Sequence, residues 1–347
     1  MDSKAHAVHH SSLSVNSQPI DIVQNPRRTG GFVLMKAFSK INLLLDVLWK
    51  RPDGYHEIKS VMQTLALHDT VTIKKAGNFQ VTCTNPNLPT DDRNIVTKAA
   101  KYMMQEFEIS QQVHIHIEKR IPISAGLAGG SSDCAATLTG LNALFDLNIP
   151  LRSAAHLTSL PVARSNPENT SMPLNEFINS PLAKADDVSL MKIGQRFGAD
   201  VPFCLMGGTA LAEGIGEKVT PLTPHPHAFV VLACPDIPVS TADIFSRYNP
   251  PLCHQSKLPG MLEALTQQNI KKIYENLSND LTQITANIHP VINILINELK
   301  NEGAIAAAMS GSGPSVFGIF TNKITAGQAY TNIQKKAVRA FLTEIQN

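Results

Sequence analysis

The chain has 347 residues and carries 30 Lys and Arg against 28 Asp and Glu, a formal net charge of +2. Hydrophobic residues make up 43% and charged residues 17%, a composition that supports sizeable cores and excludes wholesale disorder. This near-neutral balance gives no global field for nucleic acid or for an acidic membrane surface, so we expect neither as a partner. The length is typical of two domains.

The sequence has no long apolar run and no secretory signal at its start, so we expect no membrane span and a cytoplasmic protein. Its five cysteines are odd in number, widely spaced and without a C-x-x-C pair. This pattern is typical of reduced thiols and argues against a disulfide framework or a zinc site.

Hydrophobic periodicity predicts the elements along the chain. A first strand is expected over residues 33–48, where apolar side chains alternate with Lys40 and Asn42 on the opposite face. Further strands are expected at 61–73, 80–84 and 113–118, and helices at 95–107, 132–145 and 188–197.

Composition predicts how the chain divides. The polar residues 1–34 are expected to form a disordered extension, followed by an N-terminal domain over 35–212 and a C-terminal domain over 213–347. Residues 161–187 are rich in Pro, Ser and Asn and are predicted to be a surface insertion.

The strongest local feature is the segment Gly126-Leu-Ala-Gly-Gly-Ser-Ser-Asp133, between a predicted strand and a predicted helix. Its glycines let the backbone approach a ligand, and the helix that follows offers free N–H groups and a positive dipole end, which suits phosphates. Ser131 and Ser132 can cap the helix, bind a phosphate oxygen or face Mg²⁺. A glycine-rich turn with an ordinary serine cap is the alternative. The segment matches neither a Walker A loop nor a Rossmann fingerprint, and the chain lacks the protein-kinase motifs.

Three further patterns point to polar chemistry. Lys40 and Asn42 share a strand face on which a lysine can stabilise developing negative charge, although a solvated lysine is the alternative. Asp200 is expected at a helix-to-strand corner among small and apolar residues, where a carboxylate needs a partner such as Lys40; a turn aspartate is the alternative. The segment Gly311-Ser-Gly-Pro-Ser315 either brings backbone close to a ligand or forms a tight turn before a strand.

These motifs together resemble the GHMP kinase superfamily, which includes galactokinase and the homoserine, mevalonate and phosphomevalonate kinases. The segment from Pro122 to Ala136 is similar to the superfamily's glycine-serine loop. The likeness is greatest to members that act on a cytidine-bearing alcohol. It is carried by Lys40-Ile-Asn-Leu, by Arg51-Pro-Asp-Gly-Tyr-His-Glu57, and by Ala212-Glu-Gly-Ile-Gly-Glu217 after Gly198-Ala-Asp-Val-Pro202.

The resemblance implies an α+β fold, with an N-terminal domain like the second domain of ribosomal protein S5 and a ferredoxin-like C-terminal domain. ATP and substrate would meet between them, with Mg²⁺ required. The γ-phosphoryl of ATP would pass to the 2-hydroxyl of 4-diphosphocytidyl-2-C-methyl-D-erythritol, in the non-mevalonate route to isopentenyl diphosphate. A monomer or a weak homodimer is expected.

The resemblance also assigns residues. Asp200 would accept or orient the proton of the substrate hydroxyl, and Lys40 would keep Asp200 ionised. The residues expected to bind ATP are Pro122, Ile123, Ser124, Ala125, Gly126, Leu127, Ala128, Gly129, Gly130, Ser131, Ser132, Asn94 and Lys119. The residues expected to contact the substrate are Asn42, Tyr55, His56, Thr241 and Phe245, and Ser131 or Ser132 is the candidate metal ligand.

Three other functions fit parts of the sequence. Another kinase of the superfamily could act on mevalonate, a sugar or homoserine, but the Pro52 to His56 segment disfavours it. A non-catalytic nucleotide-binding protein of the same fold is disfavoured by the presence of both Lys40 and Asp200. An RNA-binding protein, suggested by the S5-like half, is disfavoured by the low net charge.

Overall fold

The computed structural model describes residues 27–29, 31–152, 188–249, 255–336 and 338–347, which form two sheets covered by helices. The eight-stranded first sheet has the order β1-β2-β3-β5-β4, and β6, β7 and β9 join it at β3, β6 and β2. Its strands are β1 (Arg27–Thr29), β2 (Phe32–Lys50), β3 (His56–Lys75), β4 (Gln80–Cys83), β5 (Val113–Glu118), β6 (Thr209–Gly214), β7 (Lys218–Pro221) and β9 (Ser278–Asn279).

A long antiparallel hairpin of β2 and β3 runs through the first sheet. Register shifts between Phe38 and Lys40 and between Asn42 and Leu44 interrupt its regular pairing. Such bulges bend a strand and change the direction of its side chains. Residues 39–47 are buried without a break, so both faces of β2 are covered there. The sequence alternation predicts one apolar and one polar face for this strand. Because the polar face is covered too, Lys40 and Asn42 are buried as well.

Four helices lie together against one face of this sheet: α1 (Ile95–Glu106), α2 (Gly129–Leu144), α5 (Leu190–Gln195) and α6 (Val201–Met206). The long helix α2 packs directly on β2 and β3. At Gly140 the helix and the sheet are so close that a Cβ atom would lie 2.6 Å from Ile73 Cδ1. This close packing sets the direction of α2 and therefore the position of its N-terminus.

The second sheet is antiparallel and has the order β10-β11-β8-β12. Its strands are β8 (Phe229–Cys234), β10 (Ala306–Met309), β11 (Val316–Phe320) and β12 (Arg339–Glu344), with α10 (Thr282–Ile288) and α11 (Val291–Asn301) before β10 and α12 (Lys323–Gln334) before β12. Helices α7 (Thr241–Ser246), α8 (Leu258–Thr266) and α9 (Ile270–Glu275) precede α10. Four strands in this order, with helices after the first and third, make the ferredoxin-like arrangement that the resemblance implied.

One hydrophobic cluster joins the two halves, which lie side by side in the space-filling view. It packs Ile41 and Val61 of the first sheet against Val230, Leu232 and Phe317 of the second. The seam between the sheets is therefore a packed core, and polar residues gather where this core ends.

The structure changes several sequence predictions. Residues 27–29 and 32–34, assigned to a disordered extension, pair as β1 and the start of β2. The domain boundary predicted after residue 212 falls inside β6, which remains in the first sheet. The predicted insertion at 161–187 lies outside the described residues.

The described residues also bear on the cysteines and on membrane-spanning helices. The described cysteines Cys83, Cys134, Cys204 and Cys234 are free thiols, as the sequence predicts. In the part of the chain that the structure describes, no helix is long and apolar enough to span a bilayer.

Candidate functional site

A cavity of about 420 Å³ opens where the two halves meet. Its walls come from β2 and β3, from the glycine loop and the start of α2, from the corner before α6, and from α7 and the turn between β10 and β11. The predicted site residues that line it are Lys40, Asn42, Ser124, Ala125, Gly126, Ala128, Gly129, Gly130, Ser131, Asp200, Thr241 and Phe245. Segments far apart in the sequence thus contribute to one cavity.

Lys40 and Asp200 meet in this cavity. Lys40 Nζ lies 3.4 Å from Asp200 Oδ2 and donates a hydrogen bond to Asn42 Oδ1 at 2.8 Å. The Asn42 amide donates in turn to Ser60 Oγ, which donates to the Leu44 carbonyl. Lys40 is 4% exposed, so its ammonium depends on these partners instead of water. The chain of hydrogen bonds fixes the Asn42 amide and, through it, the lysine.

Asp200 is the N-cap residue of α6, yet its side chain makes no capping hydrogen bond. Its backbone carbonyl accepts the first helical bond from Cys204 N at 3.0 Å. The carboxylate is therefore left for Lys40 and the cavity, and it is 30% exposed. The sequence predicts a helix-to-strand corner here. The structure instead has a helix-to-helix corner, because Val201–Met206 form α6 before the next strand.

The glycine loop ends in an uncapped helix N-terminus. Ala128, the N-cap residue of α2, has a left-handed backbone with φ of 57° and no side-chain capping bond. The N–H groups of Gly129, Gly130 and Ser131 precede the first intrahelical bond, which Ser132 N donates to Ala128 O. Three donors and the positive end of the α2 dipole therefore lie at the cavity wall.

The two serines of the loop have different surroundings. Ser132 is 1% exposed, and its hydroxyl donates to the Gly129 carbonyl at 2.9 Å. Ser131 lines the cavity and is half-buried. Of the two predicted candidates, Ser131 is therefore the one that lines the cavity. In the described ranges, no three His, Cys, Asp or Glu side chains gather as a metal site.

The turn between β10 and β11 covers the loop from the second half of the chain. Ser310 Oγ donates to the Gly126 carbonyl at 2.9 Å, and Gly126 has φ of +73°. A Cβ atom on Gly126 would lie 2.4 Å from Ser310 O, so only glycine fits. In the same turn, the Ser312 hydroxyl hydrogen-bonds that of Thr241 at 2.8 Å. The segment from Gly311 to Ser315 thus forms the tight turn before a strand that was one of the two sequence alternatives, and its residues Gly311 and Ser312 also line the cavity.

An aromatic group lies next to the cavity. The His56 ring centroid is 5.4 Å from that of Phe245 and 6.3 Å from that of Tyr248. Burial, with a smaller contribution from the Lys50 ammonium, lowers the pKa of His56 below its ordinary value. Tyr55, its neighbour in sequence, is 46% exposed. No sequence motif marks Tyr248, which follows Phe245 by three residues just beyond the end of α7 at Ser246.

Several residues expected at the ATP site do not reach the cavity. Asn94 caps α1, accepting from Val96 N and donating to Pro89 O, and Lys119 is held in a buried ion-pair cluster. Pro122 and Leu127 are buried, and Ile123 faces outward. Conversely, the cavity has apolar walls at Leu45, Ile58, Met62, Ile95 and Ile215, which no sequence motif marked.

Comparison with known proteins identifies the family. The model of the GHMP kinases N terminal domain matches residues 94–164, and that of the GHMP kinases C terminal domain matches residues 261–339. A protein of Caldicellulosiruptor bescii is 41% identical over 90% of this chain and 96% of its own length, and one of Acetivibrio thermocellus is 41% identical over 90% and 98%. Both are named 4-diphosphocytidyl-2-C-methyl-D-erythritol kinase. The chain belongs to the GHMP kinase family.

Solved structures agree with the assignment of this chain to the GHMP kinase family. A crystal structure of 4-(cytidine 5'-diphospho)-2C-methyl-D-erythritol kinase has a TM-score of 0.69 and 25% identity, covering 90% of this chain and 99% of that chain. The mevalonate kinase of L. major in complex with R-mevalonate has a TM-score of 0.61 at 14% identity, covering 93% and 98%. The second likeness shows the shared fold, which confirms the predicted fold class.

Gly126→Ala tests whether the loop needs its contact with the second half. The positive φ and the clash with Ser310 O should together lower the free energy of unfolding by more than about 2 kcal/mol. Gly54→Ala is the matched control, because Gly54 has φ of +88° but no atom within 4 Å of an added Cβ, and should cost only about 1 kcal/mol. Urea unfolding measures both, and equal losses would mean that the Ser310 contact does not constrain the loop.

Proposed function

We propose that this chain transfers the γ-phosphoryl group of ATP to the 2-hydroxyl of 4-diphosphocytidyl-2-C-methyl-D-erythritol, giving ADP and the 2-phosphate. The observation that carries the proposal is the meeting of Lys40, Asn42 and Asp200 in the cavity that also holds the uncapped start of α2. The names of the relatives, which cover most of this chain, supply the substrate. On this proposal the protein works in the cytoplasm, as a monomer or weak homodimer.

The carboxylate of Asp200 takes the proton of the substrate 2-hydroxyl while the hydroxyl oxygen attacks the γ-phosphorus of ATP. The new O–P bond forms while the bond to the ADP oxygen breaks, so ADP leaves with the electron pair. Lys40, whose Nζ lies 3.4 Å from Asp200 Oδ2 and is almost without solvent, offsets negative charge that develops near the carboxylate.

The N–H groups at the start of α2 bind the phosphates, since they have no acceptors within the helix. Phosphoryl transfer depends mostly on such positioning and charge stabilisation. The Ser131 hydroxyl is a hard oxygen ligand of the kind Mg²⁺ prefers, and together with phosphate oxygens it would hold the ion. When bound, Mg²⁺ neutralises charge on the transferring phosphates.

The cytidine base belongs, on this proposal, at the aromatic group of His56 and Phe245, with Tyr55 at its outer side. The lowered pKa of His56 keeps the ring neutral at pH 7, so one nitrogen donates and the other accepts, as pyrimidine edges require. Thr241 lies beside Phe245 on α7 and offers a hydroxyl to the same region.

A coupled assay of ADP release tests the function directly. The purified full chain is given ATP and Mg²⁺ with 4-diphosphocytidyl-2-C-methyl-D-erythritol, mevalonate or homoserine. Turnover of the cytidyl alcohol alone supports the proposal. Turnover of mevalonate or homoserine in its place, or of none of the three alcohols, contradicts it.

Asp200→Asn should lower kcat by on the order of 10² or more, because the amide cannot accept the hydroxyl proton. The KM values for both substrates should change little, since the amide keeps the size of the carboxylate. Asp243→Asn is the control, because Asp243 is exposed on α7 and pairs with Arg247 away from the reacting groups. A near wild-type kcat for Asp200→Asn would remove its role as base.

Tyr55→Ala should raise the KM for the cytidyl alcohol by about two- to tenfold and leave the KM for ATP unchanged, since an aromatic contact with the base is lost. Trp49→Ala is the control, because Trp49 is an aromatic residue of the same hairpin and is 55% exposed. Initial-rate measurements with each substrate varied in turn give the KM for the cytidyl alcohol and the KM for ATP. Parallel rises in both KM values would show that Tyr55 does not select the base.

A further inference from the structure

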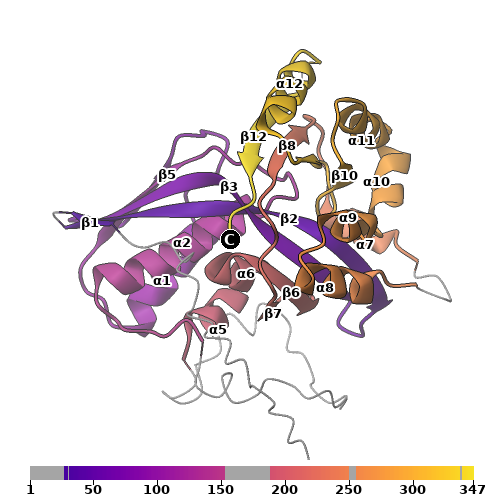
Figure 1. Cartoon of the computed structure of the whole chain (residues 1–347). Coiled ribbons are helices and arrows are strands. Elements are labelled where there is room, and N and C mark those ends of the chain that lie inside the picture. Colours follow the sequence, from indigo (N-terminus) through magenta and orange to yellow (C-terminus); the bar gives the residue numbers. More distant parts are fainter. Residues whose placement is uncertain (1–26, 30, 153–187, 250–254, 337) are drawn as a thin grey trace, which may run out of the picture.

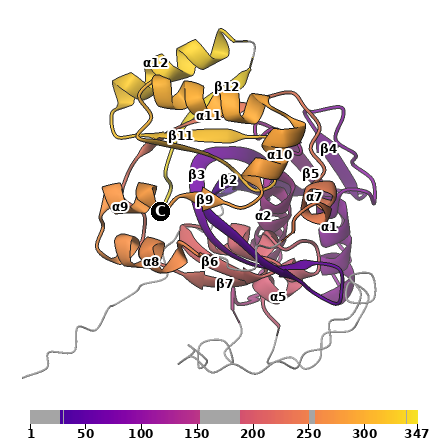
Figure 2. The same cartoon turned by 90° about the vertical axis from the view of Figure 1, so that its right-hand side faces the viewer.

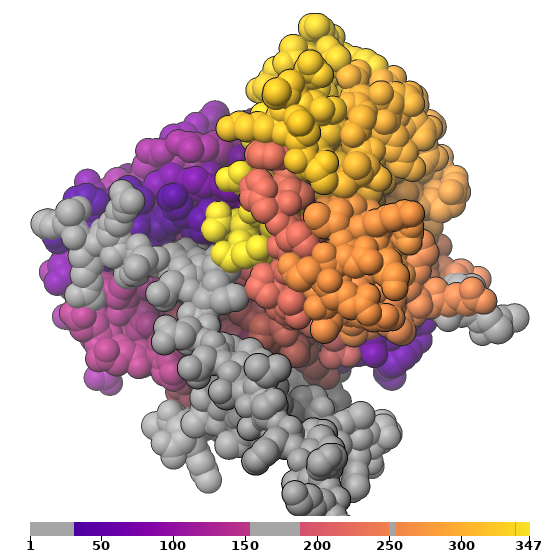
Figure 3. Space-filling view, in the orientation of Figure 1, coloured from indigo at the N-terminus to yellow at the C-terminus, as the bar shows by residue number. Residues whose placement is uncertain are grey.

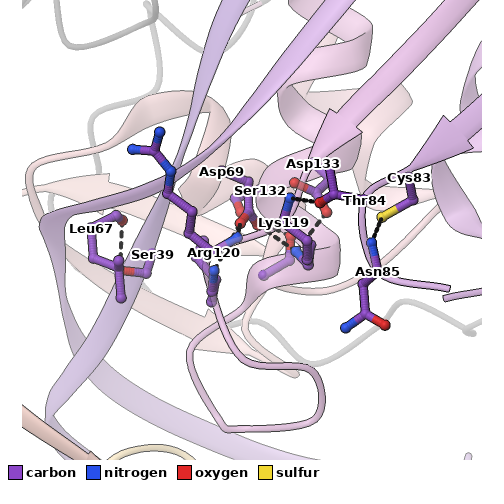
Figure 4. A network of polar contacts seen from close by, with 12 residues as sticks. Ser39, Leu67, Asp69, Cys83, Thr84, Asn85, Lys119, Arg120, Ser132 and Asp133 are labelled. Carbon is purple, nitrogen blue, oxygen red and sulfur yellow. Dashed lines mark hydrogen bonds and ion pairs between the residues drawn. The ribbon is translucent and has the colours of Figure 1, made fainter. Parts of the chain in front are cut away.

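Figure 4 shows a buried charge cluster whose three residues are not among those that line the cavity. It consists of Asp69 on β3, Lys119 directly after β5, and Asp133 near the start of α2. Lys119 Nζ donates to Asp69 Oδ2 and, at 2.7 Å, to Asp133 Oδ2. The side chains of Lys119, Asp69 and Asp133 are 3%, 0% and 2% exposed. The cluster therefore cannot meet a ligand in the cavity directly.

The cluster holds both ends of the glycine loop. At the first end, Asp69 Oδ1 accepts the backbone N–H groups of Arg120 and, at 2.8 Å, of Ile121, where β5 passes into the loop. At the second end, Lys119 Nζ donates to Asp133 near the start of α2, and it lies so close to Gly129 that a Cβ atom there would be 3.0 Å from it. The Arg120 side chain points away from Asp69 in Figure 4, so Asp69 holds this residue through its backbone.

The cluster is costly for the folded state. Burying charges carries a large desolvation penalty, and a buried ion pair often stabilises a fold no better than apolar residues of the same size. Asp133 Oδ1 has no hydrogen-bond partner among the described residues, and burial raises the pKa of Asp133 well above its ordinary value. Although burial lowers the pKa of Lys119, the two carboxylates raise it overall, so the ammonium stays charged. What the cluster does provide is a fixed geometry between strand and helix.

We propose that Lys119 is a positioning residue of the ATP site. By bridging Asp69 and Asp133 it fixes the two ends of the glycine loop, so that the N–H groups at the start of α2 point toward the triphosphate before ATP binds. The inference rests on the proposed function, because it assigns the loop to ATP.

Lys119→Met tests the role by removing the charge while keeping the length of the side chain. The KM for ATP should rise on the order of tenfold, because misplaced phosphate donors lose transition-state and ground-state contacts, whereas the KM for the cytidyl alcohol should stay within about twofold. Val113→Ala is the control, since Val113 is buried at the far end of β5. It should lower the unfolding temperature and leave the KM for ATP unchanged. A wild-type KM for ATP in Lys119→Met, or equal rises in both KM values, would overturn the proposal.

Asp133 supplies a second test that does not depend on the folding of Lys119→Met. Asp133→Asn keeps an acceptor for Lys119, whereas Asp133→Ala removes it, so the alanine variant should show the larger rise in the KM for ATP. Equal KM values in the two variants would also overturn the proposal.

Calorimetric titration of wild type and variants with ATP alone separates the proposed substrate from the proposed positioning role of Lys119. If wild type binds ATP without phosphorylating the cytidyl alcohol, the proposed substrate is wrong; if Lys119→Met binds ATP as tightly as wild type, the positioning role is wrong.

Discussion

The ion pair of Lys40 and Asp200 is the contact on which the cavity depends, because it joins a strand of the first sheet to the corner before α6. Lys40 is constrained in three ways. Its ammonium meets Asp200 and Asn42, and its backbone N–H donates to the carbonyl of Leu127 in the glycine loop at 3.1 Å. The lysine, the carboxylate and the loop therefore keep fixed relative positions. A site whose polar groups are already oriented has little to reorganise when negative charge moves from ATP toward its new acceptor.

Much of this arrangement could be predicted from the sequence, because the responsible residues carry local signals. The strand at Val113–Glu118 and the helix after the glycines follow from periodicity and from the order of residue types. Pairing Asp200 with Lys40 follows from the cost of leaving a carboxylate alone among apolar neighbours. The ferredoxin-like half came from the family resemblance, since its strands alone do not specify their order.

Other features could not be predicted, because they depend on contacts between distant segments. Asp200 begins a six-residue helix that has no sequence signal beyond Pro202. Lys119 looks like an exposed residue at a strand end, and only the packing of β3 and α2 on either side encloses it with two carboxylates. The apolar cavity wall at Ile58 and Met62 likewise depends on the pairing of β3 with β6, which local pattern does not specify.

The helices of the fold start either with a side-chain cap or without one, and α8, α10 and α11 are among those without one. Helices α1, α5 and α12 have side-chain caps from Asn94, Ser189 and Asn322, which satisfy donors of the first turn. Helices α2 and α6 have no such cap, and the N-cap residue of α6 is Asp200 itself. A side-chain cap on α2 would occupy the N–H groups that a phosphate needs, and a capping bond by Asp200 would draw its carboxylate away from Lys40. A phosphate bound at the start of α2 would accept hydrogen bonds from these N–H groups and so stabilise this helix end.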